Sequence, residues 1–148
     1  MILLDTNVLL RFANNSDPRH AVATRALDLL RAVGETLCIL PQNLYEFWVA
    51  ATRPSPVHGL GFTVAETTGL LAAFKIELTL LPDPPNLYDE WESLVTTHCI
   101  QGKPAHDARL VAGMRVHGVS RILTFNVADF ARFPRLTVID PATVGVLP

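Results

Sequence analysis

The stretch that decides the fold is Met1-Ile2-Leu3-Leu4-Asp5-Thr6-Asn7-Val8-Leu9-Leu10. A short apolar run ends at an acid, two small polar residues follow, and a second apolar run begins. This pattern predicts a buried strand over Ile2–Leu4 and a helix from about Asn7, with Asp5 at the carboxyl end of the strand. In open α/β sheets ligands bind at that edge, and a carboxylate there suits a hard cation such as Mg²⁺. The alternative is that Asp5 or Thr6 only caps the next helix.

Length and composition predict one domain over residues 1–148. Apolar residues make up 49% of the chain and charged residues 18%, which excludes the disordered class. The net charge of −2, from 12 basic and 14 acidic residues, excludes a polybasic nucleic-acid binder. Cys38 and Cys99 lie in apolar surroundings without metal-ligand spacing, so we expect two buried, reduced thiols in a cytoplasmic protein. No apolar run approaches the roughly 18 residues of a membrane span, so we expect no membrane partner.

Apolar runs and helical patterns alternate along the chain. Beyond the first strand, we expect strands over residues 36–40, 76–81, 121–125 and 136–140. Helices are expected between them, over residues 7–13, 42–52, 86–98 and 104–118, and after two start signals, Asp17-Pro18 and a capping box from Thr63 to Glu66. This order predicts an α/β fold with three α/β/α layers and a parallel sheet of about five strands. Periodicity does not predict the order of the strands within the sheet.

Glu46 is the only charged residue in the segment from 44 to 51. A helix that is apolar nearly all round should be mostly buried. A buried carboxylate without a partner is costly, so it must be protonated, paired or bound to a metal ion. The alternative is a glutamate at the edge of a crevice that pairs with a surface arginine.

Asp107 heads a stripe of apolar residues on its predicted helix. Leu110, Val111 and Met114 follow three, four and seven positions later and share its face. An isolated acid is not expected on a core-facing side, although the helix dipole alone would also favour an acid in the first turn. His106 lies about 100° round the helix from Asp107, so we expect it to be exposed and not a ligand.

Polar residues also follow the fourth predicted strand, in Leu123-Thr124-Phe125-Asn126-Val127-Ala128-Asp129-Phe130. One interpretation is that this edge adjoins Asp5 across the sheet. The other is that Asn126 and Asp129 form a capping box on a short helix.

Asp5, Glu46 and Asp107 are each anomalous for a buried setting, and they come from one strand end and two helices. Carboxylates do not cluster in ionised form without a cation between them. A shared Mg²⁺ or Mn²⁺ site accounts for all three, and its chemistry would be phosphodiester hydrolysis by a metal-activated water.

Taken in order, these motifs resemble those of PIN-domain ribonucleases, and in size and spacing the chain is similar to the VapC toxins of type II toxin–antitoxin systems. The matching pieces cover the whole chain: residues 4–9, Glu46 in its apolar helix, residues 106–108 and residues 123–130. The resemblance implies a PIN-like fold, Mg²⁺-dependent cleavage of RNA, a homodimer, and inhibition by a cognate VapB-like antitoxin.

The resemblance also implies roles for individual residues. Asp5 and Asp107 would hold the metal, and Glu46 would complete the acidic pocket and orient or deprotonate water. Thr6 and Asn7 would support the end of the first strand, as would Thr124 at the fourth. The family often has a fourth acid directly after that strand, where this chain has Asn126. Either Asp129 substitutes for it or the site works with three acids.

Two rival functions place acids at strand ends. A Mg²⁺-binding phosphoacceptor domain of the receiver type requires adjacent acids early in the chain and a lysine at a late strand end. The segment Thr124-Phe125-Asn126 argues against it. A non-catalytic interaction module on the same fold is the second alternative.

Overall fold

Five short parallel strands form the centre of the computed structural model, which describes residues 1–145. They are β1 (Ile2–Leu4), β2 (Leu37–Ile39), β3 (Thr79–Leu80), β4 (Arg121–Leu123) and β5 (Thr137–Ile139). Their order in the sheet is β3-β2-β1-β4-β5, and each neighbouring pair is parallel. The chain therefore builds the sheet outward in one direction from β1 to β3 and in the other from β4 to β5. Such a reversal creates a crevice at the carboxyl ends of the two central strands.

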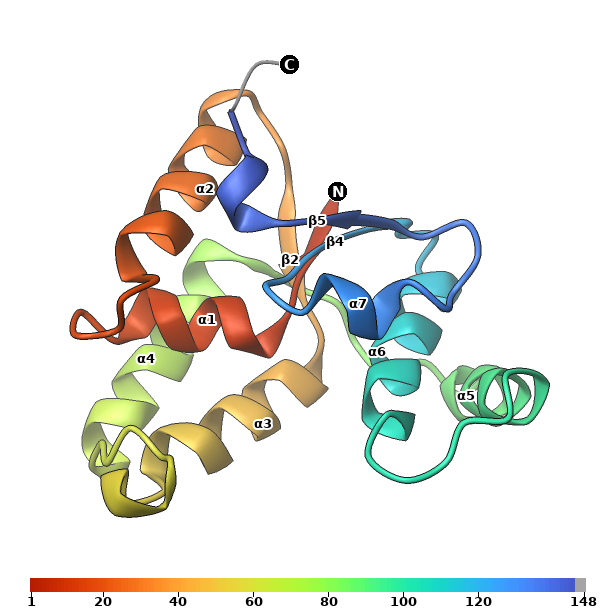
Figure 1. The fold of residues 1–148 in the computed structure, drawn as a ribbon, viewed down its shortest axis with the longest axis horizontal. Helices are drawn as coiled ribbons and strands as arrows, with labels where there is room; N and C mark the ends of the chain where they lie inside the picture. Colours follow the sequence, from red (N-terminus) through yellow and green to blue (C-terminus); the bar gives the residue numbers. More distant parts are fainter. Residues whose placement is uncertain (146–148) are drawn as a thin grey trace.

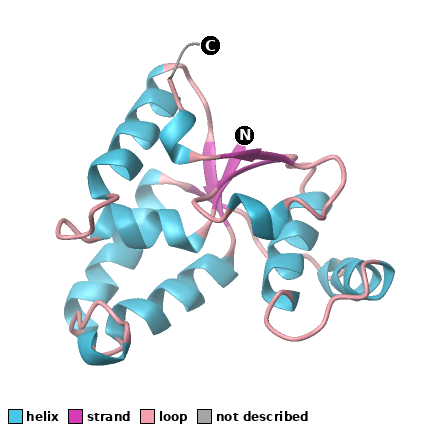
Figure 2. Cartoon of the chain, in the orientation of Figure 1, coloured by secondary structure: helices cyan, strands magenta, loops and turns pink. Residues whose placement is uncertain are grey.

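Helices cover both faces of this sheet, as the sequence predicts (Figures 1 and 2). One layer contains α1 (Thr6–Ala13), α2 (His20–Ala32), α3 (Pro41–Thr52) and α4 (Val64–Glu77), and the other contains α5 (Leu87–Thr97), α6 (Ala105–Val116) and the short α7 (Val127–Phe130). Two 3₁₀ turns, Ser55–Val57 and Pro141–Thr143, complete the described elements. The three-layer α/β/α prediction is confirmed.

Alternation along the central strand separates the two cores. Ile2 and Leu4 pack in the cluster that contains Phe47 of α3 and Phe74 of α4, whereas Leu3 packs in the cluster of α5 and α6. Successive side chains of a strand point to opposite faces. Because both faces of the sheet are covered, all three residues are apolar and fully buried.

The capping box that the sequence predicts at α4 is formed. The Thr63 hydroxyl accepts a hydrogen bond from the Glu66 amide at 3.2 Å, and the Glu66 carboxylate accepts one from the Thr63 amide at 2.7 Å. This helix continues to Glu77, so the third strand is much shorter than the predicted range 76–81. Ile76 belongs to the last turn and is 85% exposed. Helical hydrogen bonding persists until the Leu78 amide, which donates to the carbonyl of Phe74.

Two further predictions were wrong. The helix expected from Asp17 begins at His20, because the Asp17 carboxylate accepts a hydrogen bond from the Arg19 amide and closes a separate turn. Cys38 is buried as expected, but Cys99 is exposed. It follows α5 in a left-handed turn with φ 49°, which carries its side chain out of the core.

Gly113 allows α6 to lie close to the segment between β2 and α3. A β-carbon at this position would lie 2.5 Å from Cδ1 of the buried Leu40. The absence of a side chain therefore sets how near α6 comes to the start of α3. Within residues 1–145, no helix is both long enough and apolar enough to span a membrane.

Candidate active site

Asp5 lies at the carboxyl end of β1 and its side chain is directed toward β4. Its Oδ2 accepts hydrogen bonds from Asn7 Nδ2 and from Thr124 Oγ1, both at 2.6 Å. Asp5 occupies the N-cap position of α1, yet its side chain makes no capping hydrogen bond, so capping does not explain this acid. Burial raises the pKa of Asp5; the hydrogen bond from Thr124 opposes this rise, and the negative charge of Glu46 adds to it.

Asn7 and Thr124 tie the ends of the two central strands together. Asn7 Nδ2 also donates to Thr124 Oγ1 at 3.0 Å, while Asn7 Oδ1 accepts from the Phe125 amide at 3.2 Å. The Thr124 hydroxyl further accepts from the Asn126 amide at 3.0 Å. Both side chains that the sequence predicts near Asp5 are therefore in direct contact with it, and the edge after β4 does adjoin Asp5.

Glu46 projects from α3 toward the same edge of the sheet. Its Oε2 accepts from Thr6 Oγ1 at 2.9 Å, and its Oε1 accepts from Gln42 Nε2 at 2.8 Å. Thr6 is itself held by Asn43 Nδ2 at 3.2 Å. In the part of the chain that the structure describes, Glu46 has no salt-bridge partner. The alternative of a glutamate paired with a surface arginine is therefore wrong.

The prediction that α3 is mostly buried is also wrong for one of its sides. Tyr45 is 65% exposed and Val49 is 54% exposed, whereas Phe47 is fully buried. The apolar residues all round α3 therefore serve two surfaces, one in the core and one that faces solvent. Glu46 lies between them and is half-buried.

Asp107 sits in the first turn of α6 and is half-buried. Leu110, Val111 and Met114 on its face are all buried, which confirms the stripe predicted from the sequence. His106 is exposed, also as predicted.

The charges of several acids affect the pKa of Asp107. Burial is the largest cause that raises its pKa, to about 6, and the charges of Asp129, Asp5 and Glu46 raise it further, whereas His106 lowers it. Like charges disfavour ionisation only when they are close. The four acids singled out in the sequence therefore share one electrostatic environment.

Asn126 and Asp129 do not form the predicted capping box. Asn126 is the N-cap of α7, but its side chain accepts no capping hydrogen bond, and only the backbone amide of Asp129 returns to the Asn126 carbonyl. The Asn126 backbone is instead drawn to Thr124. Asp129 is exposed, and its charge acts on Asp107.

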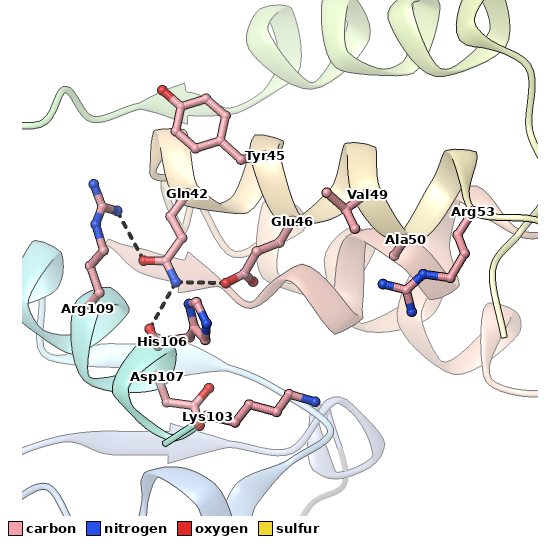
Figure 3. Close-up of a pocket in the computed structure, with 10 residues that line it drawn as sticks. All are labelled: Gln42, Tyr45, Glu46, Val49, Ala50, Arg53, Lys103, His106, Asp107 and Arg109. Carbon is pink, nitrogen blue, oxygen red and sulfur yellow. Dashed lines mark hydrogen bonds between the residues drawn. The ribbon is translucent and has the colours of Figure 1, made fainter. Parts of the chain in front are cut away.

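Gln42 is a site residue that the sequence reasoning missed. Its Nε2 donates to Glu46 and also to the His106 carbonyl at 2.9 Å, and its Oε1 accepts from Arg109 at 3.1 Å (Figure 3). Arg109 is anchored in turn by Asp83 at 2.7 Å. The sequence pattern that could have revealed Gln42 is its position one helical turn before Glu46, because side chains at i and i+4 contact each other on a helix.

A pocket of about 620 Å³ opens between α3 and α6 beside these acids (Figure 3). Its α3 wall carries Gln42, Tyr45, Glu46, Val49, Ala50 and Arg53, and the facing wall carries Lys103, His106, Asp107 and Arg109. Acidic oxygens thus lie in the middle of the pocket, with cationic side chains around them.

The donor set fits a hard cation. Asp5 and Asp107 supply carboxylate oxygens, the ligands that Mg²⁺ and Mn²⁺ prefer, with no cysteine among the pocket residues. Burial is the largest cause that raises the pKa of both acids, and the charge of Glu46 adds to it in each case, so a cation beside them would stabilise their ionised forms. Within residues 1–145, no three Asp, Glu, His or Cys side chains form a group that could hold a metal ion by themselves. Mg²⁺ does not require such a group, because it keeps several waters and uses one or two carboxylates with substrate phosphates.

The chain belongs to the PIN domain family, whose model matches residues 2–136. It is 29% identical to Ribonuclease VapC24 of Mycobacterium tuberculosis over 150 residues, covering 97% of this chain and 98% of that protein. Its fold is similar to VapBC2 of Rickettsia felis bound to promoter DNA (TM-score 0.67, 20% identity, 95% of this chain and 98% of that one). It is also similar to VapC20 of M. tuberculosis, a toxin that cleaves the sarcin–ricin loop (TM-score 0.62, 19% identity, 82% and 87%).

Proposed function

We propose that this chain is a single PIN domain acting as a metal-dependent endoribonuclease, the toxin of a type II toxin–antitoxin pair. The observation that carries the proposal is the convergence of Asp5, Glu46 and Asp107 on the edge of the sheet where the strand order reverses. These acids destabilise one another unless a cation joins them. The similarity to a relative named as a ribonuclease supports RNA as the substrate.

In this proposal Asp5 and Asp107 hold Mg²⁺, with Mn²⁺ as a substitute. When bound, the ion supplies positive charge to the scissile phosphate and makes a water more acidic. Asn7 and Thr124 keep the Asp5 carboxylate in one orientation through two short hydrogen bonds. Asp129 adds negative charge near Asp107 and takes the place of the acid that Asn126 does not provide.

Glu46 positions and deprotonates the attacking water. Each carboxylate oxygen offers two acceptor sites, and Thr6 and Gln42 occupy one site on each oxygen of Glu46. One site per oxygen is left for water. Because both oxygens are held, the free acceptor sites have fixed directions, and such preorganisation favours the reaction geometry.

The proposed partners are RNA, a VapB-like antitoxin and a second copy of the chain, in the cytoplasm. Similarity in fold to VapBC complexes supports the antitoxin. A phosphoacceptor domain is not favoured, because the end of β4 carries Thr124 where a receiver-type site needs a lysine. A non-catalytic PIN-like module is separated from the enzyme by an assay of cleavage.

The test is incubation of the purified chain with RNA in the presence of Mg²⁺, with and without a chelator. We expect cleavage that requires the metal and that Asp5→Asn abolishes. Asp28→Asn is the matched control, because Asp28 lies on α2 with its side chain 66% exposed. RNA that stays intact under all metal conditions would favour the non-catalytic module. Cleavage that survives both the chelator and Asp5→Asn would refute the metal site.

A further inference from the structure

One stripe of α3 has no role in the site described above. Tyr45, Val49 and Arg53 follow one another at i, i+4 and i+8 and therefore share one side of the helix. All three side chains are exposed, and all three line the pocket. Large apolar side chains that are exposed side by side and bordered by polar groups mark contact surfaces.

Two cationic side chains lie toward one end of this stripe, on opposite walls of the pocket. Arg53 caps the carboxyl end of α3, and Lys103 lies just before α6; Figure 3 shows both side chains extending along the pocket beyond Glu46 and Asp107. Among the residues that the structure describes, neither has a salt-bridge partner. Arg109, at the opposite end, is neutralised by Asp83.

The backbone of Arg53 is fixed by the loop that follows it. The Gly61 amide donates to the Arg53 carbonyl at 2.9 Å, and the Leu60 amide donates to the Ala50 carbonyl at 3.0 Å. Gly59 packs so closely that a β-carbon there would lie 1.8 Å from the Arg53 carbonyl oxygen. The loop thus returns against the end of α3 and holds the start of the Arg53 side chain in place.

The chemistry of this surface specifies its ligand. Lysine and arginine bind phosphates, and an exposed aromatic ring stacks an unpaired base. We propose that Tyr45, Val49, Arg53 and Lys103 form a subsite that holds single-stranded RNA beside the cleaved bond. Arg53 and Lys103 bind backbone phosphates there, and Tyr45 stacks one base. The inference rests on the proposed ribonuclease function, since it names how that same pocket takes its substrate.

Charge complementarity favours RNA over a second copy of the chain as the ligand of this surface. The acids of the pocket repel a polyanion, so its phosphates need cations nearby. Of the lysine and arginine side chains that line the pocket, Arg53 and Lys103 are the two without a salt-bridge partner within residues 1–145. A contact between two identical apolar stripes would instead bring the Arg53 side chains into a desolvated interface, which is costly for unpaired charges.

The experiment measures binding of a fluorescein-labelled single-stranded RNA by fluorescence anisotropy over a range of salt concentrations. It uses an Asp5→Asn background, so that the RNA stays intact. Each phosphate contact contributes about 0.7 to the slope of log K against log salt for single strands. Arg53→Gln and Lys103→Gln should therefore each reduce the slope by about 0.7, and together by about 1.4. Arg25→Gln on α2 and Lys75→Gln on α4, both exposed, are the charge-matched controls and should leave it unchanged.

Tyr45 gives an independent readout. Tyr45→Leu should weaken binding about 5-fold or more without changing the salt slope, because stacking does not release counterions. Tyr45→Phe keeps the ring and should bind like the parent. Unchanged slopes in both cation variants would overturn the subsite. So would sedimentation showing that Tyr45→Leu converts a dimer to monomers, because the stripe would then be a contact between copies.

These outcomes are separable from those of the proposed function. If the parent cleaves RNA and the cation variants bind with the parent's slope, the ribonuclease stands and the subsite fails. If the slopes change as expected but the parent cleaves nothing in Mg²⁺, the surface binds RNA and the enzymatic proposal fails.

Discussion

Carboxylates at the two ends of the sheet have different surroundings, and their pKa values shift in opposite directions. At the amino ends of the strands, Glu35 receives both Nη atoms of Arg121, at 2.5 and 2.7 Å, and its Oε2 lies 3.7 Å from the amino group of Met1. The hydrogen bond from Arg121 is the largest cause that lowers the pKa of Glu35. At the carboxyl ends, Asp5 accepts hydrogen bonds from neutral donors, and Asp107 has the charges of Asp129, Asp5 and Glu46 near it. Burial is the largest cause that raises the pKa of each.

This difference separates an acid that stabilises the fold from acids that serve a site. A carboxylate whose pKa is lowered on folding adds to the free energy of unfolding at neutral pH, whereas one whose pKa is raised subtracts from it. Asp5 and Asp107 therefore lower the free energy of unfolding of the protein when no cation is bound. Perturbed groups that gather in a cleft point to function.

The largest expected effect comes from removing one charge at the carboxyl ends. Asp5→Asn and Asp107→Asn should each reduce Mg²⁺-dependent cleavage by at least about 100-fold, since each removes an anionic ligand of the ion. Neither should lower the melting temperature, because repulsion within the cluster is relieved. Initial rates of RNA cleavage and thermal melts of the two variants provide the check. Either variant cleaving at the parent's rate would show that the metal assignment is wrong.

Glu46→Gln should have the next largest effect, a loss of cleavage of about 100-fold, at the lower end of the range for a general base. Glutamine keeps the contacts to Thr6 and Gln42 within reach but cannot accept a proton. Circular dichroism should show α3 unchanged, and Glu46→Ala should be no less stable. A lower melting temperature with intact turnover would instead make Glu46 a structural residue.

Binding of a metal ion should offset the destabilisation that the acids at the carboxyl ends of the strands cause. Mg²⁺ or Mn²⁺ near-saturating for the native site should raise the melting temperature by several degrees through mass action. Asp107 has a folded pKa of about 6, above its reference value of 3.8, so its charge destabilises the metal-free protein increasingly as pH rises between these values. The metal-induced gain should therefore shrink as pH falls through about 6. Melts at several pH values, with Asp107→Asn as control, test this; a gain that is the same at every pH contradicts it.

Asp129→Asn should have a smaller effect, an appreciable reduction in cleavage without unfolding. Among the neighbouring charges, that of Asp129 raises the pKa of Asp107 most, so the variant should also lower the pKa of Asp107. Asn126→Asp should be tolerated. Turnover at saturating Mg²⁺ and a titration of Asp107 by NMR are the measurements. Unchanged turnover would leave Asp5, Glu46 and Asp107 as the complete acidic set.

The smallest expected effect on cleavage is that of Glu35→Gln, which should leave it unchanged. The melting temperature should fall by a few degrees at most, as expected for a partly exposed ion pair. Because the folded pKa of Glu35 lies below 4.5, its contribution is present above that pH and is lost as pH falls through the lowered value. Loss of activity in this variant would mean that the two ends of the sheet are coupled.

The sequence predicted the layers of the fold and the acids that gather at the carboxyl ends of the strands, because burial patterns and strand ends are local properties. Asp5 after β1 and Asp107 above a buried stripe were both recognisable in this way. The sequence did not predict the strand order, since periodicity records how much of an element is buried but not which element lies beside it. The link from Asp83 through Arg109 to Gln42 was invisible for the same reason. The exposed side of α3 was misread because apolar residues can face a ligand as well as a core.

The hydrogen bond between Thr124 and Asp5 joins positions 119 apart in the chain. Ribosomes add roughly 5–20 residues per second, so Thr124 is made about 6 to 24 s after Asp5. Until β4 is synthesised and pairs with β1, the Asp5 carboxylate lacks its hydroxyl partner, and the crevice between these two strands does not yet exist. In the ribonuclease proposed above, this order of synthesis prevents a short nascent chain from cutting the message from which it is being translated. The topology of the sheet therefore delays assembly of the candidate site until β4 has been synthesised.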